Sequence, residues 1–372
     1  MPSEYEASLL AGHPNPAADY ALSPAVLFWE ITRACALACR HCRAEAQPKR
    51  HPLELTTEQG FALVDEIARF RPSPILVITG GDPLMRRDLF DVAAHAVSRG
   101  LRTSLSPSVT ALVTRDNLTR AYDAGVRHIS FSLDGATPEV HDGFRGVEGA
   151  FERTLTAIKT AHEVGLTVQV NTTVSQRNHA QLEEMADIVG RSGAVQWDLF
   201  FLVPTGRARA EEMLSPQEHE EVYHWLYDLS HRATFRVKTT LGQPFRRVVL
   251  QRAAQDGVQA DSVPTTNDGK GICFVSHLGE IYPSGFLPVR CGNVLTHSLV
   301  EVYQSHPIFL ALRDPGHLKG KCGVCPFNAC CGGCRARAYA CTGDYLAAEP
   351  CCVYLTTSQD SAPSAPLAVS RR

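Results

Sequence analysis

The feature of this sequence that most limits its possible folds is a series of six short β-type runs, each followed by a helix-type pattern. The runs cover residues 25–31, 75–79, 102–106, 128–133, 167–173 and 195–202. Strands that alternate with helices pair in parallel, because each helix returns the chain to the edge from which the next strand starts. Six βα units in series predict an α/β fold whose parallel sheet forms a barrel or a partial barrel.

The helix-type patterns have clear start and stop signals. Thr56 and Gln59 predict a capping box at the start of a helix over 56–70, whose apolar residues recur at helical spacing. Similar stripes cover 89–98, 117–124, 150–164 and 181–189. These helices are expected to end at glycines, which accept the positive φ of a C-terminal cap: Gly100, Gly125, Gly165 and Gly190.

Composition excludes several classes of partner. The 372 residues are 44% hydrophobic, which is enough for a sizeable core, and the net charge of −3 gives no basic footprint for nucleic acid or an anionic membrane. The sequence contains neither an apolar run of transmembrane length nor a signal-peptide pattern. We therefore expect a cytoplasmic protein with no nucleic-acid or membrane partner.

The 13 cysteines fall into two groups that are far apart in the sequence. Cys35, Cys39 and Cys42 form the first group, and the other ten lie between Cys273 and Cys352. Without an export signal, thiolate metal ligands are a better explanation than disulfides. The spacing predicts two separate metal-binding regions.

The first cysteine group lies where a parallel sheet places its chemistry. Functional loops follow the carboxyl ends of parallel strands, so loops 32–42 and 79–84 should open on one face. The first loop supplies three thiolates, one fewer than a closed iron–sulfur cube or zinc site needs. One metal corner would remain open for a ligand.

These two loops resemble the signature of the radical S-adenosylmethionine (SAM) superfamily. The resemblance rests on the C-x3-C-x2-C spacing, on Arg43 and Ala44 after it, and on the turn Gly80-Gly81-Asp82-Pro83 after the second strand. It implies a partial (β/α)6 TIM-like barrel with a [4Fe–4S] cluster whose open iron binds SAM. It also implies reductive cleavage of SAM to a 5′-deoxyadenosyl radical, hydrogen abstraction from a substrate, and an electron donor such as flavodoxin or ferredoxin.

The resemblance also assigns SAM-binding residues. Gly80 and Gly81 would let the backbone approach the methionyl end, and Asp82, where the family usually has Glu, would face the ammonium group. Further positions that match those holding SAM in the family are Ser106, Ser132, Asp134, Arg145, Asn171 and Leu202. Arg145 is expected to meet the SAM carboxylate, and His141 is expected to be a surface helix residue.

Residues 265–356 resemble the SPASM/Twitch auxiliary domain of radical SAM enzymes, a small cysteine-rich iron–sulfur domain. The resemblance implies an auxiliary [4Fe–4S] cluster held by Cys322, Cys325, Cys331 and Cys352, with Cys273 as a fifth candidate or a ligand of a second cluster. The sequence departs from the full two-cluster pattern at Arg335, where that pattern has a cysteine. The number of auxiliary clusters, one or two, therefore stays open. The roles of the remaining thiols also stay open: Cys291, Cys330, Cys334, Cys341 and Cys351. A zinc site of Cys322, Cys325, Cys331 and Cys334 is the alternative.

The expected domain order is an N-terminal extension (1–22), the radical SAM barrel (23–235), a bridging segment (236–264), the auxiliary domain (265–356) and a disordered tail (357–372).

Runs 271–277, 282–288 and 335–340 look most like enzymes of the alternative haem and haem d1 pathways, which act on tetrapyrrole propionates. Four basic residues are candidates to bind substrate carboxylates: Arg207, Lys238, Arg246 and Arg247. A peptide-modifying maturase is the alternative enzyme, with a peptide in place of a small-molecule substrate. A non-catalytic iron–sulfur electron carrier would leave the barrel unexplained.

Overall fold

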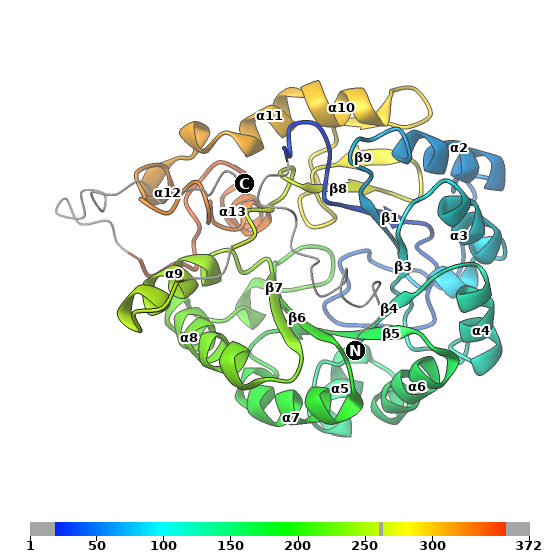
Figure 1. Cartoon of the computed structure of the whole chain (residues 1–372), viewed down its shortest axis with the longest axis horizontal. Helices are drawn as coiled ribbons and strands as arrows, with labels where there is room; N and C mark the ends of the chain where they lie inside the picture. The colour runs from blue at the N-terminus through cyan, green and yellow to red at the C-terminus, as the bar shows by residue number, and fades with distance from the viewer. Residues whose placement is uncertain (1–18, 260–262, 355–372) are drawn as a thin grey trace.

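A computed structural model describes residues 19–259 and 263–354, and within them the strands form one ten-stranded sheet (Figure 1). The strand order is β10-β9-β8-β1-β2-β3-β4-β5-β6-β7. The strands are β1 (Val26–Glu30), β2 (Ile75–Thr79), β3 (Thr103–Leu105), β4 (His128–Ser132), β5 (Thr167–Val174), β6 (Gln196–Phe201), β7 (Arg236–Thr240), β8 (Ile272–Val275), β9 (Glu280–Tyr282) and β10 (Gly292–Asn293). From β1 to β7 all neighbours pair in parallel, which confirms the predicted α/β partial barrel.

The sheet extends beyond the six predicted strands at both of its edges. β7 lies in the segment expected to bridge the two domains, yet it pairs in parallel with β6. β8 comes from the cysteine-rich region and pairs in parallel with β1. Among the described strands, the antiparallel pairs are β8 with β9 and β9 with β10, at the far edge of the sheet. The C-terminal region is therefore continuous with the barrel sheet.

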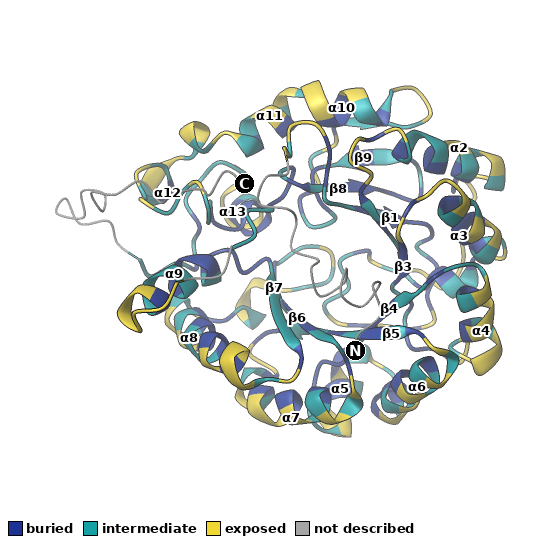
Figure 2. Ribbon diagram, viewed as in Figure 1, coloured by how far each residue is buried: buried dark blue, intermediate teal, exposed yellow. Residues whose placement is uncertain are grey.

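Helices cover the outer face of the curved sheet, with buried residues toward the strands and exposed ones outward (Figure 2). They are α2 (Thr57–Ile67), α3 (Leu89–Ser98), α4 (Arg115–Asp123), α5 (Pro138–Arg145), α6 (Ala150–Val164), α7 (Leu182–Ser192), α8 (Pro216–Arg232) and α9 (Phe245–Gln255). The capping box of Thr56 and Gln59 is present, and Val64 and Ile67 of α2 are fully buried. Hydrophobic periodicity thus predicted α2, α3, α4, α6 and α7, whereas α5, α8 and α9 were not among the predicted stripes.

One predicted helix end is wrong. Gly190 lies inside α7, and the left-handed residue that caps this helix is Gly193, with φ of 74°. The other three predicted stop glycines, Gly100, Gly125 and Gly165, do adopt positive φ. α7 thus ends at Ser192, three residues beyond the predicted end at Val189.

The cysteine-rich region packs beside the open side of the barrel (Figure 1). Its helices are α10 (Leu299–Ser305), α11 (Pro307–Arg313), α12 (Gly320–Gly323) and α13 (Arg335–Thr342). In the residues described, none of the helices has both the length and the apolar character needed to cross a bilayer. The expected tail over 357–372 and most of the N-terminal extension lie outside the described residues.

Candidate active site

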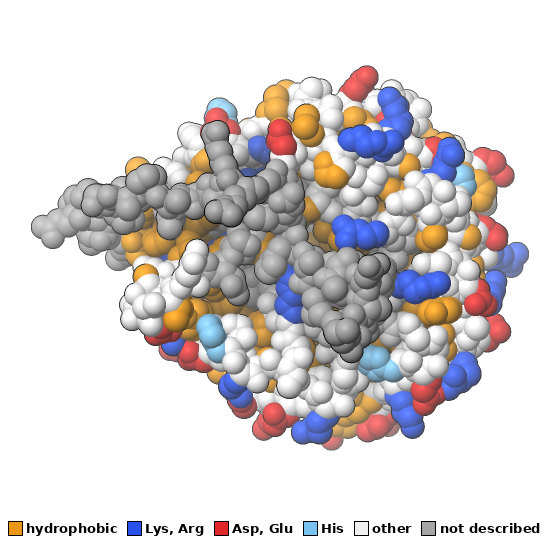
Figure 3. All heavy atoms as spheres, in the orientation of Figure 1, with side chains coloured by type: hydrophobic (Ala, Val, Ile, Leu, Met, Phe, Trp, Pro, Cys, Tyr) orange, Lys and Arg blue, Asp and Glu red, His pale blue; other side chains and the backbone are white. Residues whose placement is uncertain are grey.

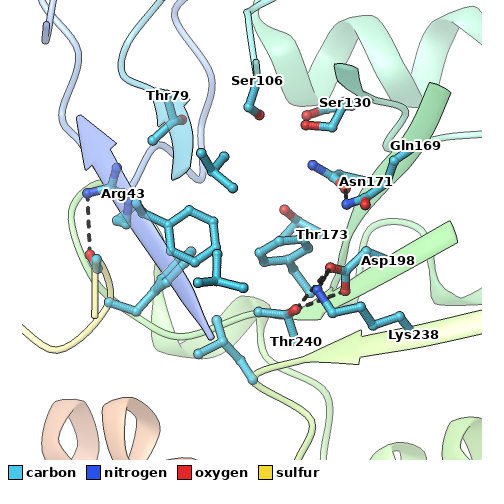
Figure 4. A pocket seen from close by; sticks show the side chains of 18 of the residues that line it. Arg43, Thr79, Ser106, Ser130, Gln169, Asn171, Thr173, Asp198, Lys238 and Thr240 are labelled. Atoms are coloured by element: carbon cyan, nitrogen blue, oxygen red, sulfur yellow. Dashed lines mark hydrogen bonds and ion pairs between the residues drawn. The ribbon is translucent and has the colours of Figure 1, made fainter. Parts of the chain in front are cut away.

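The inner face of the curved sheet encloses a cavity of about 730 Å³ (Figure 4). Its lining runs from the loop after β1 to the amino-terminal ends of several strands, including Ile75 and Thr167. Cys35, Cys39 and Cys42 all line it. The three thiols therefore open into one space with the inner face of the barrel.

Hydrogen-bond donors surround the three sulfur atoms. The Leu37 N–H lies 3.3 Å from Cys35 Sγ, the Ala46 N–H 3.4 Å from Cys42 Sγ, and Arg145 Nη1 3.8 Å from Cys39 Sγ. Burial raises the pKa of the Cys35 and Cys39 thiols, so their thiolate forms need a compensating positive charge. Donors aimed at sulfur in an apolar pocket suit an iron–sulfur cluster, since such contacts stabilise cluster thiolates.

The Gly80-Gly81 turn packs directly against the strand end that leads into the cysteine loop. A Cβ on Gly80 would lie 2.5 Å from the Thr32 carbonyl oxygen, and a Cβ on Gly81 2.4 Å from that of Ala34. The Gly81 N–H donates to the Thr32 carbonyl at 2.8 Å. Both glycines line the cavity, so only residues without a side chain allow the turn to lie beside the thiols.

Asp82 was predicted to face the SAM ammonium group, but its side chain does not line the cavity. One carboxylate oxygen accepts the Leu84 N–H at 3.2 Å and caps the short helix η1 (Pro83–Met85), and the other accepts the Thr110 hydroxyl at 2.8 Å. Burial raises the pKa of this carboxyl to about 6. Asp82 thus holds the turn in place from behind, and the backbone of Gly80 and Gly81 faces the cavity.

Arg145 lines the cavity, held by Asp134. Arg145 Nη2 lies 2.5 Å from Asp134 Oδ2, and the Asp134 side chain is fully buried behind it. His141, expected on the surface, is only 1% exposed, and its Nδ1 accepts the Asp134 N–H at 2.9 Å. The prediction of a surface position was wrong, because the face of α5 that carries His141 packs against the loop after β4. Burial, followed by the charge of Arg145, lowers the pKa of His141 to about 4, so the ring is a neutral acceptor.

The four remaining predicted SAM contacts all line the same cavity: Ser106, Ser132, Asn171 and Leu202. Figure 4 shows Ser106, in the loop after β3, and Asn171, on β5, pointing into the space. The Asn171 amide oxygen accepts from the Gln169 side chain at 2.6 Å, which fixes its orientation. The structure therefore brings together all but two of the predicted cofactor-binding side chains, Asp82 and Asp134, which support the site from outside the lining.

The inner wall contains a polar half that the sequence reasoning largely missed. Inward-facing residues on β4 to β7 include Ser130, Gln169, Thr173, Asp198, Lys238 and Thr240 (Figure 4). They recur at every second position, which is the side-chain period of a strand and the signal that could have found them. Lys238 Nζ lies 2.6 Å from Asp198 Oδ2, and the Thr240 hydroxyl donates to the same carboxylate at 2.9 Å.

The facing half of the wall is apolar. It is built by residues of β1, β2 and β8 that include Val26, Phe28, Ile75, Val77 and Phe274. At the edge of this wall, the Arg43 guanidinium lies 4.7 Å from the Phe274 ring centroid and pairs with Glu30 at 2.9 Å. The cavity thus offers one face to a hydrophobic surface and the other to polar groups.

Cations outnumber carboxylates in the described lining. Six cations line the cavity against two acids: Arg43, Arg102, Arg145, Arg236, Lys238 and Arg246 against Asp198 and Asp268. The whole chain, by contrast, has a net charge of −3. On the face in Figure 3, some Lys and Arg side chains lie near the centre, and others lie at the periphery among the Asp and Glu side chains. Arg43 and Arg145 are paired with Glu30 and Asp134 behind the lining, and the cations that remain still outnumber the two acids, which suits an anionic ligand.

Comparison with known proteins agrees with this geometry. The model of the radical SAM superfamily matches residues 29–189. The AdoMet-dependent heme synthase of Methanosarcina barkeri is 40% identical over 341 residues, which span 89% of this chain and 97% of that protein. The protein of the same name from Oleidesulfovibrio alaskensis is 39% identical, over 89% of this chain and 88% of its own length.

This chain belongs to the radical SAM superfamily. Radical SAM enzymes hold a [4Fe–4S] cluster and SAM, cleave SAM reductively to a 5′-deoxyadenosyl radical and abstract hydrogen from a substrate, so this one needs a one-electron reductant and a substrate. The solved structure of Streptococcus suis SuiB bound to S-adenosylmethionine has the same fold, with a TM-score of 0.69 at 14% identity over 90% of this chain and 78% of that one.

A second, smaller cavity of this radical SAM enzyme lies in the C-terminal region. Its lining includes the four cysteines predicted to act together: Cys322, Cys325, Cys331 and Cys352. The Glu349 N–H donates to Cys322 Sγ at 3.2 Å, and the Gly333 N–H to Cys331 Sγ at 3.4 Å. Arg247 and Lys321 line the same cavity and supply positive charge near the thiols.

The alternative zinc ligand set is not brought together. Cys334 is fully buried in a separate apolar cluster with Leu287 and Leu312, where its Sγ accepts the Arg337 N–H at 3.3 Å. In the described ranges, no three Cys, His, Asp or Glu side chains converge on a single-ion position. Cys273 is also fully buried, on β8 beside Leu27 of β1 and outside both cavities. The structure therefore separates Cys273 and Cys334 from the four thiols that share a cavity.

Proposed function

We propose that this radical SAM enzyme acts on a propionate side chain of a haem-type tetrapyrrole. The observation that carries the proposal is the two-sided cavity: an apolar wall for the face of a macrocycle, and a polar wall with excess cations for its carboxylates. The relatives named AdoMet-dependent heme synthase support the same substrate class.

The site residues take these proposed roles. Cys35, Cys39 and Cys42 hold the [4Fe–4S] cluster, which when bound supplies the electron that cleaves SAM. The backbone of Gly80 and Gly81 receives the methionyl end, and Arg145 meets its carboxylate as a two-pronged donor. Four residues of the wall surround the ribose and adenine: Ser106, Ser132, Asn171 and Leu202. Asp82 and Asp134 act from behind, by fixing the turn and the Arg145 guanidinium.

We further propose that residues 265–356 form an auxiliary unit with one [4Fe–4S] cluster on Cys322, Cys325, Cys331 and Cys352. The shared cavity, the N–H donors and the two cations support this ligand set. Such a cluster is a one-electron sink inside the same molecule. A second cluster that uses Cys273 is less supported, because that thiol lies in the hydrophobic core beside Leu27.

The acceptor role has its own test. Hydrogen abstraction precedes oxidation of the substrate radical, so Cys325→Ala should leave 5′-deoxyadenosine formation largely intact while it stops product formation. Normal product formation by this variant would remove the acceptor role. Flavodoxin or ferredoxin is the proposed external donor, as expected for an enzyme that works in the cytoplasm.

A peptide-modifying maturase is the second candidate function. It is favoured by the mycofactocin maturase MftC of Mycobacterium tuberculosis (strain ATCC 25618 / H37Rv), which is 30% identical over 85% of this chain and 80% of that protein. The cationic cavity would then require an acidic peptide. The higher identity to the heme synthases makes the tetrapyrrole the stronger proposal.

Deuterium transfer separates the two candidates. The reconstituted enzyme, with dithionite and SAM, is incubated with an iron porphyrin whose propionate methylene groups are deuterated, and in parallel with peptides encoded beside its gene. The proposal predicts deuterium in 5′-deoxyadenosine and a decarboxylated tetrapyrrole. Transfer from a peptide, with none from the porphyrin, would refute it.

A further inference from the structure

Four basic residues were candidates for substrate carboxylates, and the structure separates them by what their side chains already bind. Arg246 donates to the carbonyls of Cys330 and Thr266, so its guanidinium is bound to backbone. Arg247 pairs with Glu220 at 2.5 Å and lines the smaller cavity. Arg207 does not line the main cavity. Lys238 lines the main cavity, and its ammonium group is bound to a side-chain carboxylate and not to backbone carbonyls.

Lys238 is held in place by its neighbours on the polar wall. It lies on β7 directly opposite Asp198 of β6, and its Nζ is 2.6 Å from the carboxylate. The Asp198 side chain is 1% exposed, whereas that of Lys238 is 43% exposed, toward the cavity it lines. An ammonium group has three N–H donors, and the bond to Asp198 uses one of them. Two donors remain for a ligand.

We infer that Lys238 is the anchor for a substrate carboxylate on the polar wall, and that Asp198 and Thr240 position its ammonium group. This inference rests on the proposed tetrapyrrole substrate and adds how that substrate is oriented. Arg236, two residues before Lys238 on the same face of β7, also lines the cavity and interacts with Asp198 through its charge.

The depth of Lys238 in the barrel determines how a ligand anchored there is oriented toward the SAM loops. Lys238 comes two residues before Thr240, the last residue of β7, while the cysteine loop follows the last residue of β1. A carboxylate bound at Lys238 thus lies deeper in the barrel than the loops at the carboxyl ends of the strands. The apolar side chains of Phe28, Val77 and Phe274 face the polar wall and offer a surface for the macrocycle. The opposite rim of the ring is then directed toward the SAM loops.

The test compares a free-acid ligand with its ester. An iron porphyrin with free propionates, and the same porphyrin as its methyl ester, are each titrated into the reconstituted enzyme while the Soret band is followed. Lys238→Met should weaken binding of the free acid by about tenfold to a hundredfold, the usual range for a lost charged hydrogen bond, and leave ester binding as in wild type. Lys238→Arg, which keeps the charge, should restore most of the affinity. Asp198→Asn should weaken binding of the free acid by a smaller factor, again with no effect on the ester.

Lys159→Met, on the exposed face of α6, is the matched control and should bind both ligands as wild type does. Equal affinity of Lys238→Met and wild type for the free acid, or an equal loss for acid and ester, would overturn the anchor while the proposed function stands. A wild-type enzyme that binds neither porphyrin would overturn the proposed function and the anchor together.

Discussion

Arg337 and Glu349 form an ion pair of 3.2 Å in which neither side chain is more than 1% exposed. The Arg337 guanidinium also donates to the carbonyls of Phe201 and Leu241, at the carboxyl ends of β6 and β7. The Glu349 carboxylate accepts the backbone N–H of Cys334 at 2.6 Å. One buried pair therefore ties the barrel rim to the cysteine-rich segment.

Breaking this pair should be costly. Arg337→Met leaves the Glu349 carboxylate buried without its paired cation, and we expect a loss of about 3–5 kcal/mol in the free energy of unfolding. Urea titration followed by tryptophan fluorescence measures it. The double variant Arg337→Met/Glu349→Gln should lose less than the sum of the two single variants, because no uncompensated charge remains. Additive losses would show that the two residues do not act as a pair.

The glycine turn gives a prediction with a control in the same chain. Gly81→Ala places a Cβ 2.4 Å from the Ala34 carbonyl oxygen, so the turn must move away from the cysteine loop. We expect SAM binding, measured by equilibrium dialysis, to weaken by at least tenfold. Gly143→Ala in α5 meets no atom within 4 Å and should bind SAM normally. Wild-type affinity in Gly81→Ala would exclude a role for the close approach.

Iron counts test the two proposed clusters. The reconstituted protein should hold about 8 iron atoms, as two cubanes require, and the variant with Cys35, Cys39 and Cys42 all replaced by Ala should hold about 4. That variant should form no 5′-deoxyadenosine. Zinc in place of the remaining iron would contradict the auxiliary cluster, and surviving SAM cleavage would contradict the assignment of the first group.

Two serine variants in the C-terminal region distinguish a ligand from a buried thiol. Cys352 lines the smaller cavity, whereas Cys334 packs in an apolar cluster. Cys352→Ser should lower the iron content by about half and weaken the absorbance near 400 nm, since about half the iron belongs to each cubane. Cys334→Ser should retain both signals. The reverse result would favour the ligand set that includes Cys334.

His219 predicts a pH dependence of stability. It is 1% exposed, with Nδ1 3.0 Å from the Ser215 carbonyl, and burial lowers its pKa from 6.5 to about 4. In the unfolded chain His219 binds a proton below about pH 6.5, and in the folded chain only near pH 4. The stability that the neutral, buried ring contributes is therefore complete above pH 6.5 and decreases as the pH falls. The decrease amounts to about 3 kcal/mol by pH 4.

His219→Gln removes this titration. The variant should be less stable than wild type at pH 7.5, and the difference in unfolding free energy should shrink by about 2 kcal/mol at pH 5, a value that follows from the shift. His317→Gln, which replaces a histidine of the exposed helix η4 (Pro315–His317), is the control and should follow the wild-type pH profile. A constant difference between wild type and His219→Gln would contradict the prediction.

The sequence by itself determined the features that depend on near neighbours in the chain. The six βα units, the capping box at Thr56, the three-thiol loop and the Gly80-Gly81 turn were all predicted, because helical and strand periods and capping residues act over a few positions. The grouping of four distant cysteines came from a family resemblance, and the structure places those four around one cavity.

Only the tertiary structure decided where side chains and strands meet partners that are far away in the sequence. The pairing of β8 with β1, the burial of His141 and the position of Asp82 behind its turn each depend on segments that pack from elsewhere in the chain. The same holds for Lys238, whose basic character is visible in the sequence. Its pairing with Asp198 and its exposure to the cavity follow from the register of β6 with β7, and no local pattern specifies that register.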